Sequence, residues 1–245
     1  MNLPAEALKD LRQSMGAVLR YMIAVMLAVF SCRLLLFAAQ HRFPEETYPQ
    51  LFAMTRLLAF LYLAFAASAV QAVCLAMLGA EIDRPLWKYK GMSDALQRFF
   101  VPWLIINLFL ITLVDIQSRL LAADMTDVAV LLEFVILMTH AAAMPVAACI
   151  MHWGALEWGE LGEALRPLGR LFSLALLPFA VGIIQYLMSS ARALGASDNM
   201  LIDLVYFSVT DVPLLLLEVF IFAMVWRICM HHRSLPPVDD NPLDF

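Results

Sequence analysis

The sequence has few charged residues for its length. Lysine, arginine, aspartate and glutamate make up 15% of its 245 residues, whereas hydrophobic residues make up 63%. A soluble domain of average composition has about 25% charged and about 45–50% apolar residues. At a mean hydropathy of +0.81, the chain lacks the polar side chains needed to cover a water-exposed surface. This scarcity excludes an ordinary soluble domain.

A long block of one charge is also missing. The 16 basic and 21 acidic residues give a net charge of -5 that is spread over short segments. A nucleic-acid-binding surface needs clustered lysine and arginine. We therefore expect no nucleic-acid partner.

The sequence contains no motif of the common enzyme classes. It has no HExxH zinc signature, no GxSxG nucleophile elbow and no glycine-rich phosphate-binding loop. We therefore predict no catalytic residue set and no cofactor. The chain is interpreted as a non-enzyme unless its polar residues converge on a cavity.

Cysteine and histidine are sparse and unsuitably spaced for a metal site. The cysteines lie in apolar segments without CxxC spacing, at Cys32, Cys74, Cys149 and Cys229. Membrane-buried thiols are usually small packing residues, so we expect no disulfide framework. His140, Cys149 and His152 share one segment, but their spacing does not bring three ligands to one point on a helix. Adjacent His231 and His232 diverge, and no metal is predicted.

Long apolar runs fill most of the chain. A membrane-spanning helix needs about 20 mostly apolar residues and satisfies its backbone hydrogen bonds internally. We predict six such spans, at about 15–39, 53–80, 99–121, 127–152, 171–194 and 201–230. The predicted fold class is therefore an all-α, polytopic membrane bundle over residues 1–233. The acidic, proline-rich residues 234–245 are expected to form a disordered cytoplasmic tail.

The distribution of lysine and arginine predicts the orientation of these spans. Six spans place the amino terminus, the loops after the second and fourth spans, and the carboxyl tail on one side. The opposite side holds five of the 16 basic residues, namely Arg33, Arg42, Arg56, Arg119 and Arg192. The first side therefore holds the other 11. By the positive-inside rule, both termini are cytoplasmic.

An internal repeat predicts three tandem hairpins. Similar segments follow the odd-numbered spans: RLLLFAA from Arg33, RLLAAD from Arg119 and RALGASD from Arg192. Cysteines close the even-numbered spans at intervals of 75 and 80 residues, at Cys74, Cys149 and Cys229. A fixed period of this kind indicates a repeated structural unit.

Each odd-numbered span is preceded by an amphipathic stretch. Apolar side chains recur there at intervals of three and four residues, as in Leu3, Ala7, Leu11 and Met15; in Met92, Leu96, Phe99 and Trp103; and in Leu161, Leu165, Leu168 and Phe172. This spacing places each set on one helical face. We interpret these stretches as connectors that lie at the cytoplasmic membrane interface.

Ionisable residues inside predicted spans form a candidate polar path. Glu133 and His140 lie in the fourth span, Asp211 and Glu218 in the sixth, and Asp115 near the end of the third. Each of the first two pairs is seven residues apart, so its members share a helix face about 10 Å apart. Such groups are costly in lipid and raise the question of a proton or small-solute route. The alternative is hydrogen bonding between helices, to which Gln71, Asn107 and Gln185 would contribute.

The connector GMSDALQRFF and the ending FIFAMVWRICMHHR, together with chain length, resemble the uncharacterised six-helix bacterial inner-membrane proteins of the YciC-like type. The resemblance implies a bacterial inner-membrane location and transfers no functional residue.

Three functions remain open. The first is a non-enzymatic scaffold or accessory subunit of a membrane assembly, with the lipid bilayer, other membrane proteins or a second copy of the chain as partners. The second is a small-solute or proton-coupled transporter or channel that uses the candidate polar path. The third is an intramembrane enzyme, which requires two of these polar groups to converge within hydrogen-bond reach.

Overall fold

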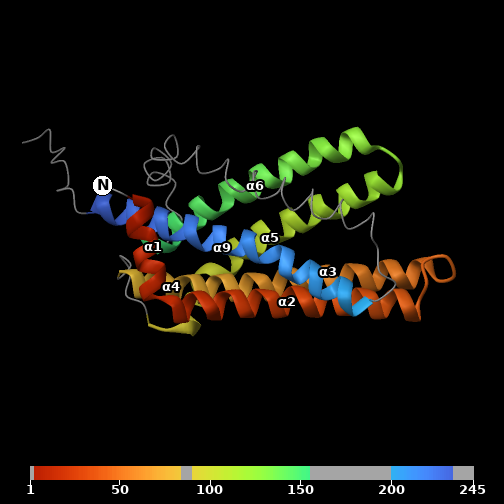
Figure 1. Ribbon diagram of the computed structural model, residues 1–245. Helices are drawn as coiled ribbons and strands as arrows, with labels where there is room; N and C mark the ends of the chain where they lie inside the picture. Colours follow the sequence, from red (N-terminus) through yellow and green to blue (C-terminus); the bar gives the residue numbers. More distant parts are fainter. Residues whose placement is uncertain (1–2, 84–89, 155–199, 234–245) are drawn as a thin grey trace, which may run out of the picture.

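A computed structural model of the chain describes residues 3–83, 90–154 and 200–233 (Figure 1). All regular structure in these ranges is helical, in agreement with the predicted all-α class. The helices are α1 (Leu3–Gln13), α2 (Met15–Arg42), α3 (Pro49–Val70), the π-helix η1 (Gln71–Leu75), α4 (Ala76–Ile82), α5 (Met92–Ala122), α6 (Thr126–Trp153) and α9 (Met200–Arg233). The predicted span 171–194 and the predicted tail 234–245 lie outside the described residues.

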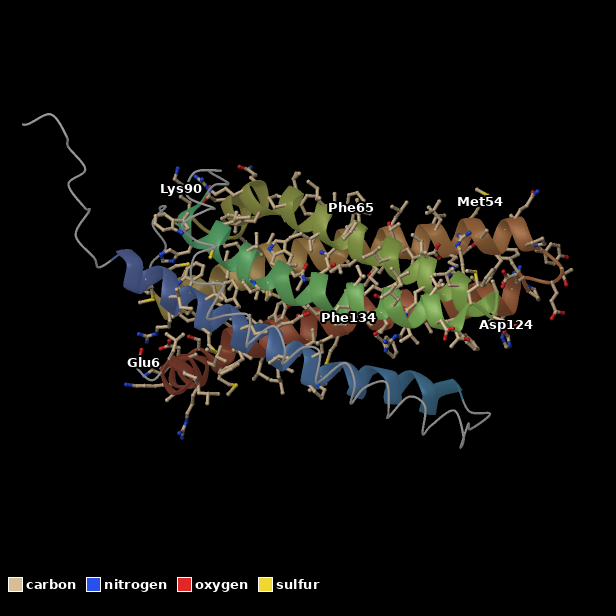
Figure 2. All side chains as sticks on the ribbon, turned by 90° about the horizontal axis from the view of Figure 1, so that it is seen from above. Glu6, Met54, Phe65, Lys90, Asp124 and Phe134 are labelled. Carbon is tan, nitrogen blue, oxygen red and sulfur yellow. The ribbon has the colours of Figure 1, made fainter. Side chains whose placement is uncertain are left out.

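The long helices lie lengthwise beside one another, and α1 lies across one end of the bundle (Figures 1 and 2). Two short connections lie at the opposite end, one between α2 and α3 and one between α5 and α6. The latter turns at Asp124, whose φ of 57° is left-handed, a conformation that aspartate tolerates better than most residues. Helices α6 and α9 both run toward the α1 end (Figure 1).

Four of the described segments are long and apolar enough to cross a membrane: Met15–Arg42, Pro49–Ile82, Met92–Leu121 and Val212–Met230. In the most apolar windows of the first three, only 22%, 28% and 17% of the residues are buried inside the protein. Apolar side chains therefore cover the outside of the bundle, as Figure 2 shows along its length. Water-soluble monomers rarely expose apolar patches larger than a few hundred Å². The chain is a multi-pass membrane protein.

Two helices begin earlier than the predicted spans. Pro49 starts α3, because a proline at the first helical position loses no intrahelical hydrogen bond. Helix α5 starts at Met92, so the amphipathic stretch from Met92 to Trp103 forms about its first three turns and is not a separate connector. Along this stretch Met92 is exposed, whereas Phe99 and Trp103 are buried in the core.

The apolar face of α1 packs against protein. Ala7 is fully buried and lies in a cluster with Ala223 and Met224 of α9, and Leu3 and Leu11 pack around it. The fourth member of the predicted stripe, Met15, belongs to α2 and is exposed. Most of the stripe thus holds α1 on α9.

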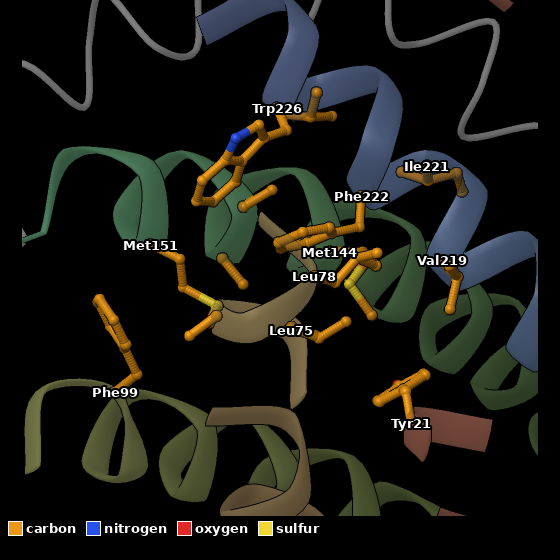
Figure 3. Close-up of a cluster of buried hydrophobic side chains, with 14 of the residues drawn as sticks. Tyr21, Leu75, Leu78, Phe99, Met144, Met151, Val219, Ile221, Phe222 and Trp226 are labelled. Atoms are coloured by element: carbon orange, nitrogen blue, oxygen red, sulfur yellow. The ribbon is translucent and has the colours of Figure 1, made fainter. Parts of the chain in front are cut away.

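Helix α4 packs closely against α9 in the core. Trp226 is fully buried, and its ring lies 5.3 Å from that of Phe222 and 4.8 Å from that of His152. Leu78 and Met144 lie close to the same contact (Figure 3). A Cβ atom added at Gly79 would lie under 3.0 Å from the Trp226 indole. The missing side chain of Gly79 is therefore what allows the two helices to approach.

We predict that Gly79→Ala lowers the thermal stability of the detergent-purified protein. The added methyl group would collide with a rigid ring, and such overpacking costs about 1–3 kcal/mol. Gly16→Ala is the matched control, because its Cβ would meet only the flexible Arg20 guanidinium at 3.7 Å. Alanine is also the better helix former, so this variant should match or exceed the wild-type Tm. Equal melting of Gly79→Ala and wild type would contradict the proposed close contact.

Candidate functional site

A π-helical turn interrupts the second long span. Residues Gln71–Leu75 form η1 between α3 and α4. A π-turn places an extra residue in the helix and is often found at functional sites. Gln71, its first residue, and Ser68, one turn before it, are both buried. Ser68 and Gln71 thus place two polar side chains in the interior of the bundle, at the start of the π-helical turn.

Asn107 of α5 joins these two side chains. Its Nδ2 donates one hydrogen bond to Ser68 Oγ at 2.9 Å and another to Gln71 Oε1 at 2.6 Å. All three residues are buried. The Ser68 hydroxyl donates in turn to the Ala64 carbonyl at 2.5 Å. The two donors of one amide group therefore fasten α5 to both α3 and η1.

A second buried pair joins the chain's first and last long helices. Tyr21 Oη of α2 donates to Glu218 Oε2 of α9 at 2.8 Å, across 197 residues of sequence. Gln71 also lies beside the Tyr21 hydroxyl, which connects this pair to Asn107. We call Ser68, Asn107, Gln71, Tyr21 and Glu218 the buried polar chain. It links α2, α3, η1, α5 and α9.

A second polar group, the distal cluster, lies on α3 and α5 nearer the end opposite α1. It consists of Arg56, Asp115, Ser118 and Arg119. Asp115 accepts from Arg56 at 2.6 Å and from Arg119 at 2.8 Å. Arg56 also donates to Ser118 Oγ at 2.5 Å and lies over the Phe60 ring, 5.4 Å from its centre. Two arginines share one carboxylate here, so the cluster keeps a net positive charge.

The predicted polar-path residues fall in different places. Glu218 belongs to the buried polar chain and Asp115 to the distal cluster, whereas Glu133 of α6 accepts a hydrogen bond from Gln117 of α5. His140 and Asp211 lie within α6 and α9, but their side chains lie outside what the structure describes. A path through these two therefore stays a prediction.

The two described groups are separated along α5. Asn107 and Asp115 are eight residues apart, which is about 12 Å of helix. Thr112 lies between them, and its hydroxyl donates to the Leu108 carbonyl of its own helix at 2.7 Å. No polar side chain in the described part of α5 is seen to bridge the gap.

The chemistry of the buried polar chain favours hydrogen bonding between helices over proton conduction. The amides of Asn107 and Gln71 donate and accept hydrogen bonds but do not ionise near neutral pH. The pair Tyr21 and Glu218 is the one step in the chain where both groups are titratable. Within the described residues, no group of three histidine, cysteine or acidic side chains is placed to hold a metal ion.

Tyr21 and Ser68 were not identified by sequence reasoning. A tyrosine or serine in an apolar run is ordinary, and nothing in the run identifies its partner. The spacing of Ser68 and Gln71, one helical turn apart, was the available signal, because it places two hydrogen-bonding groups on one face. The partners Asn107 and Glu218 lie on other helices, beyond the reach of a local pattern.

A buried charge pair was missed in the same way. Asp10 of α1 is only 5% exposed, and its two carboxylate oxygens accept from Arg227 of α9. Glu6 lies 3.8 Å from the same guanidinium. Two-pronged arginine–carboxylate pairs are directional as well as strong. Together with the Ala7 contacts, this pair holds α1 on the end of α9.

An apolar groove lies between α5 and α6. Its volume is about 580 Å³, and eight residues line it: Ile105, Ile106, Phe109, Phe134, Val135, Thr139, Ala143 and Val146. None of these side chains is charged, so the groove is suited to acyl chains or apolar helix surfaces. It is not suited to an ion or a polar solute.

These features define a multi-pass helical membrane protein with a buried polar chain across its main helices. No protein-family model matches the sequence, and no curated protein or solved structure matches it either. The residues of the site are therefore assigned from their geometry.

We predict that Tyr21→Phe destabilises the bundle. The substitution removes the hydroxyl that bonds to Glu218 and lies beside Gln71, and an inter-helix hydrogen bond in a membrane protein contributes about 0.6 kcal/mol, up to about 1.7. The Tm in detergent should fall by a few degrees.

Tyr62→Phe is the matched control for this measurement. Tyr62 is 41% exposed and bonds to Ser31, whose hydroxyl also bonds to the Leu27 carbonyl at 2.7 Å. Its loss should change the Tm less. Equal effects of the two substitutions would show that the buried polar chain adds no special stability.

Proposed function

We propose that the chain is a non-enzymatic scaffold or accessory subunit of a membrane assembly in the bacterial inner membrane. One observation carries this proposal: several polar side chains in the described bundle bond from one helix to another. Tyr21 bonds to Glu218, Asn107 to Ser68 and Gln71, and Arg56 to Asp115. Bonds of this kind hold helices in one arrangement, which is what a scaffold requires.

The outer surface supports the same function. Large apolar side chains are more than half exposed on several helices, for example Leu27 on α2, Leu58 on α3, Ile105 on α5 and Leu131 on α6. The apolar groove between α5 and α6 adds a concave surface of the same chemistry. Membrane helices associate through close packing of such surfaces. The proposed partners are other membrane proteins or a second copy of the chain.

Six spans with both ends on one side form part of the proposal. Helix α6 ends near α1, whereas α9 begins at the opposite end of the bundle (Figure 1). In the proposed topology, the chain between Gly154 and Met200 crosses the membrane once more. The apolar segment 171–194 is long enough for one crossing. The larger number of basic residues on the α1 side supports a cytoplasmic location for that side.

Reporter fusions test this topology. A reporter joined after Glu160 should be cytoplasmic, and one joined after Asp198 should lie across the membrane. A green fluorescent protein fusion would then fluoresce only at the first position, and an alkaline phosphatase fusion would be active only at the second. The same reporter active at both positions would contradict a crossing by 171–194.

A proton-coupled transporter or channel is the second candidate. It is favoured by the titratable pair Tyr21 and Glu218, which is buried beside a π-helical turn. Intramembrane carboxylates often mark proton or ion pathways. The gap along α5 and the uncharged groove weigh against it, because neither provides a continuous polar route.

Reconstituted vesicles distinguish the two candidates. For a scaffold, vesicles with the purified wild-type chain should acidify no faster than empty vesicles when a pH gradient is applied, as measured with an enclosed pH-sensitive dye. Glu218→Gln should behave identically and keep nearly the wild-type Tm, because the amide oxygen still accepts the Tyr21 hydrogen bond. Proton entry into wild-type vesicles that is lost in Glu218→Gln would overturn the scaffold and establish the transporter.

A further inference from the structure

Two cysteines far apart in sequence meet between α6 and α9. Cys229 Sγ donates to Cys149 Sγ at 3.5 Å, across 80 residues. Both residues are buried: Cys149 is 5% exposed and Cys229 is 4% exposed. They belong to the same core cluster as Met151 and Trp226, so the surrounding packing holds the two sulfurs in contact.

The other cysteines have different surroundings. Cys32 of α2 donates to the Ala59 carbonyl at 3.3 Å. Cys74 lies in η1 and is partly exposed. Among the four cysteines, all of which the structure describes, the contact of two sulfurs is seen for Cys149 and Cys229. The two cysteines in contact are two of the three that end even-numbered predicted spans.

The contact places the two sulfurs within reach of a disulfide bond. An S–S bond is about 2.05 Å long, so sulfurs that are 3.5 Å apart need to approach by about 1.5 Å. Small side-chain rotations on two helices can supply such a shift. The bond would close a loop of 80 residues and join α6 covalently to α9.

We propose that Cys149 and Cys229 form a dithiol site that a small, uncharged hydroperoxide converts to a disulfide. In the first step, one thiol sulfur attacks the peroxide oxygen and the O–O bond breaks. This gives a sulfenic acid and releases water or an alcohol. In the second step, the other sulfur attacks the sulfenic sulfur, the S–S bond forms and a second water leaves. The two sulfurs together lose two electrons, which the peroxide accepts.

The burial of the pair determines which oxidant suits it. A charged or bulky disulfide reagent cannot enter an apolar helix interface, whereas hydrogen peroxide is neutral and little larger than water. Burial also makes the first step slower than at an exposed thiolate. Once a sulfenic acid forms, the adjacent thiol captures it before further oxidation. The site is independent of the proposed scaffold function and does not use the buried polar chain.

The test uses the full-length chain in lipid nanodiscs, reduced and then treated with hydrogen peroxide or with the smallest lipid-soluble analogue in common use, tert-butyl hydroperoxide. Thiols that remain are alkylated after denaturation, and the protein is digested and analysed by mass spectrometry. A cross-linked peptide pair containing Cys149 and Cys229, reversed by dithiothreitol, is the expected product. Treatment with the charged disulfide of glutathione should leave the pair reduced.

Two variants make the result specific. Cys32→Ser combined with Cys74→Ser keeps only the proposed pair and should form the same cross-link to the same extent. Cys149→Ser leaves Cys229 without its resolving thiol, so its sulfenic acid should be trapped by dimedone. If Cys149→Ser fails to fold, the double variant alone still decides. Alkylation of both Cys149 and Cys229 after both peroxides would overturn the proposal, as would equal cross-linking of Cys32 or Cys74 with either of them.

Discussion

The hydrocarbon interior of a membrane offers no hydrogen-bond partner, and this constraint governs where the polar side chains of the described spans lie. A polar side chain on a span has to find its partner on another span, bond to the backbone of its own helix or extend to the headgroups. Asn107, Gln71 and Ser68 satisfy one another, and Tyr21 satisfies a carboxylate oxygen of Glu218. The arrangement of the helices is therefore tied to a few specific bonds, while the apolar side chains on the outside tolerate many arrangements.

Close packing works together with these bonds. Gly79 allows α4 to approach α9 at Trp226, about two turns of helix beyond the buried Gln71. Glu218 and Trp226 are separated by a similar distance on α9. The polar contacts and the tight contact thus lie on the same pair of segments. Asp10 and Arg227 extend the same interface to α1, so α9 is joined to the first helices of the chain at three levels.

The polar residues of the bundle differ in what they offer to function. The distal cluster of Arg56, Asp115 and Arg119 combines exposed and partly buried charge near one end of the helices. The buried polar chain lies deeper and is built largely from neutral groups. Cys149 and Cys229 lie closer to the other end, four residues before the ends of α6 and α9. A scaffold with an independent thiol pair is consistent with all three placements.

The sequence by itself determined that the long apolar segments lie in lipid and that the fold is helical. Long apolar runs with few charges indicate helices in lipid, because a helix makes all the backbone hydrogen bonds of one segment without a neighbouring segment. The signals were local in each case: the length of the apolar runs, their few charges and the three- and four-residue spacing of the apolar stripe in α1. The candidate carboxylates were also visible, because a single Glu218 within an apolar run is conspicuous.

Only the tertiary structure decided which of these residues meet. Tyr21 and Glu218 are 197 residues apart, Asp10 and Arg227 are 217 apart, and Cys149 and Cys229 are 80 apart. Helical periodicity specifies the face on which a side chain lies but carries no information about the neighbouring helix or its register. The π-turn at Gln71 and the stripe of α1 that packs on α9 depend on that register. For this reason, the site could be recognised only after the helices were placed together.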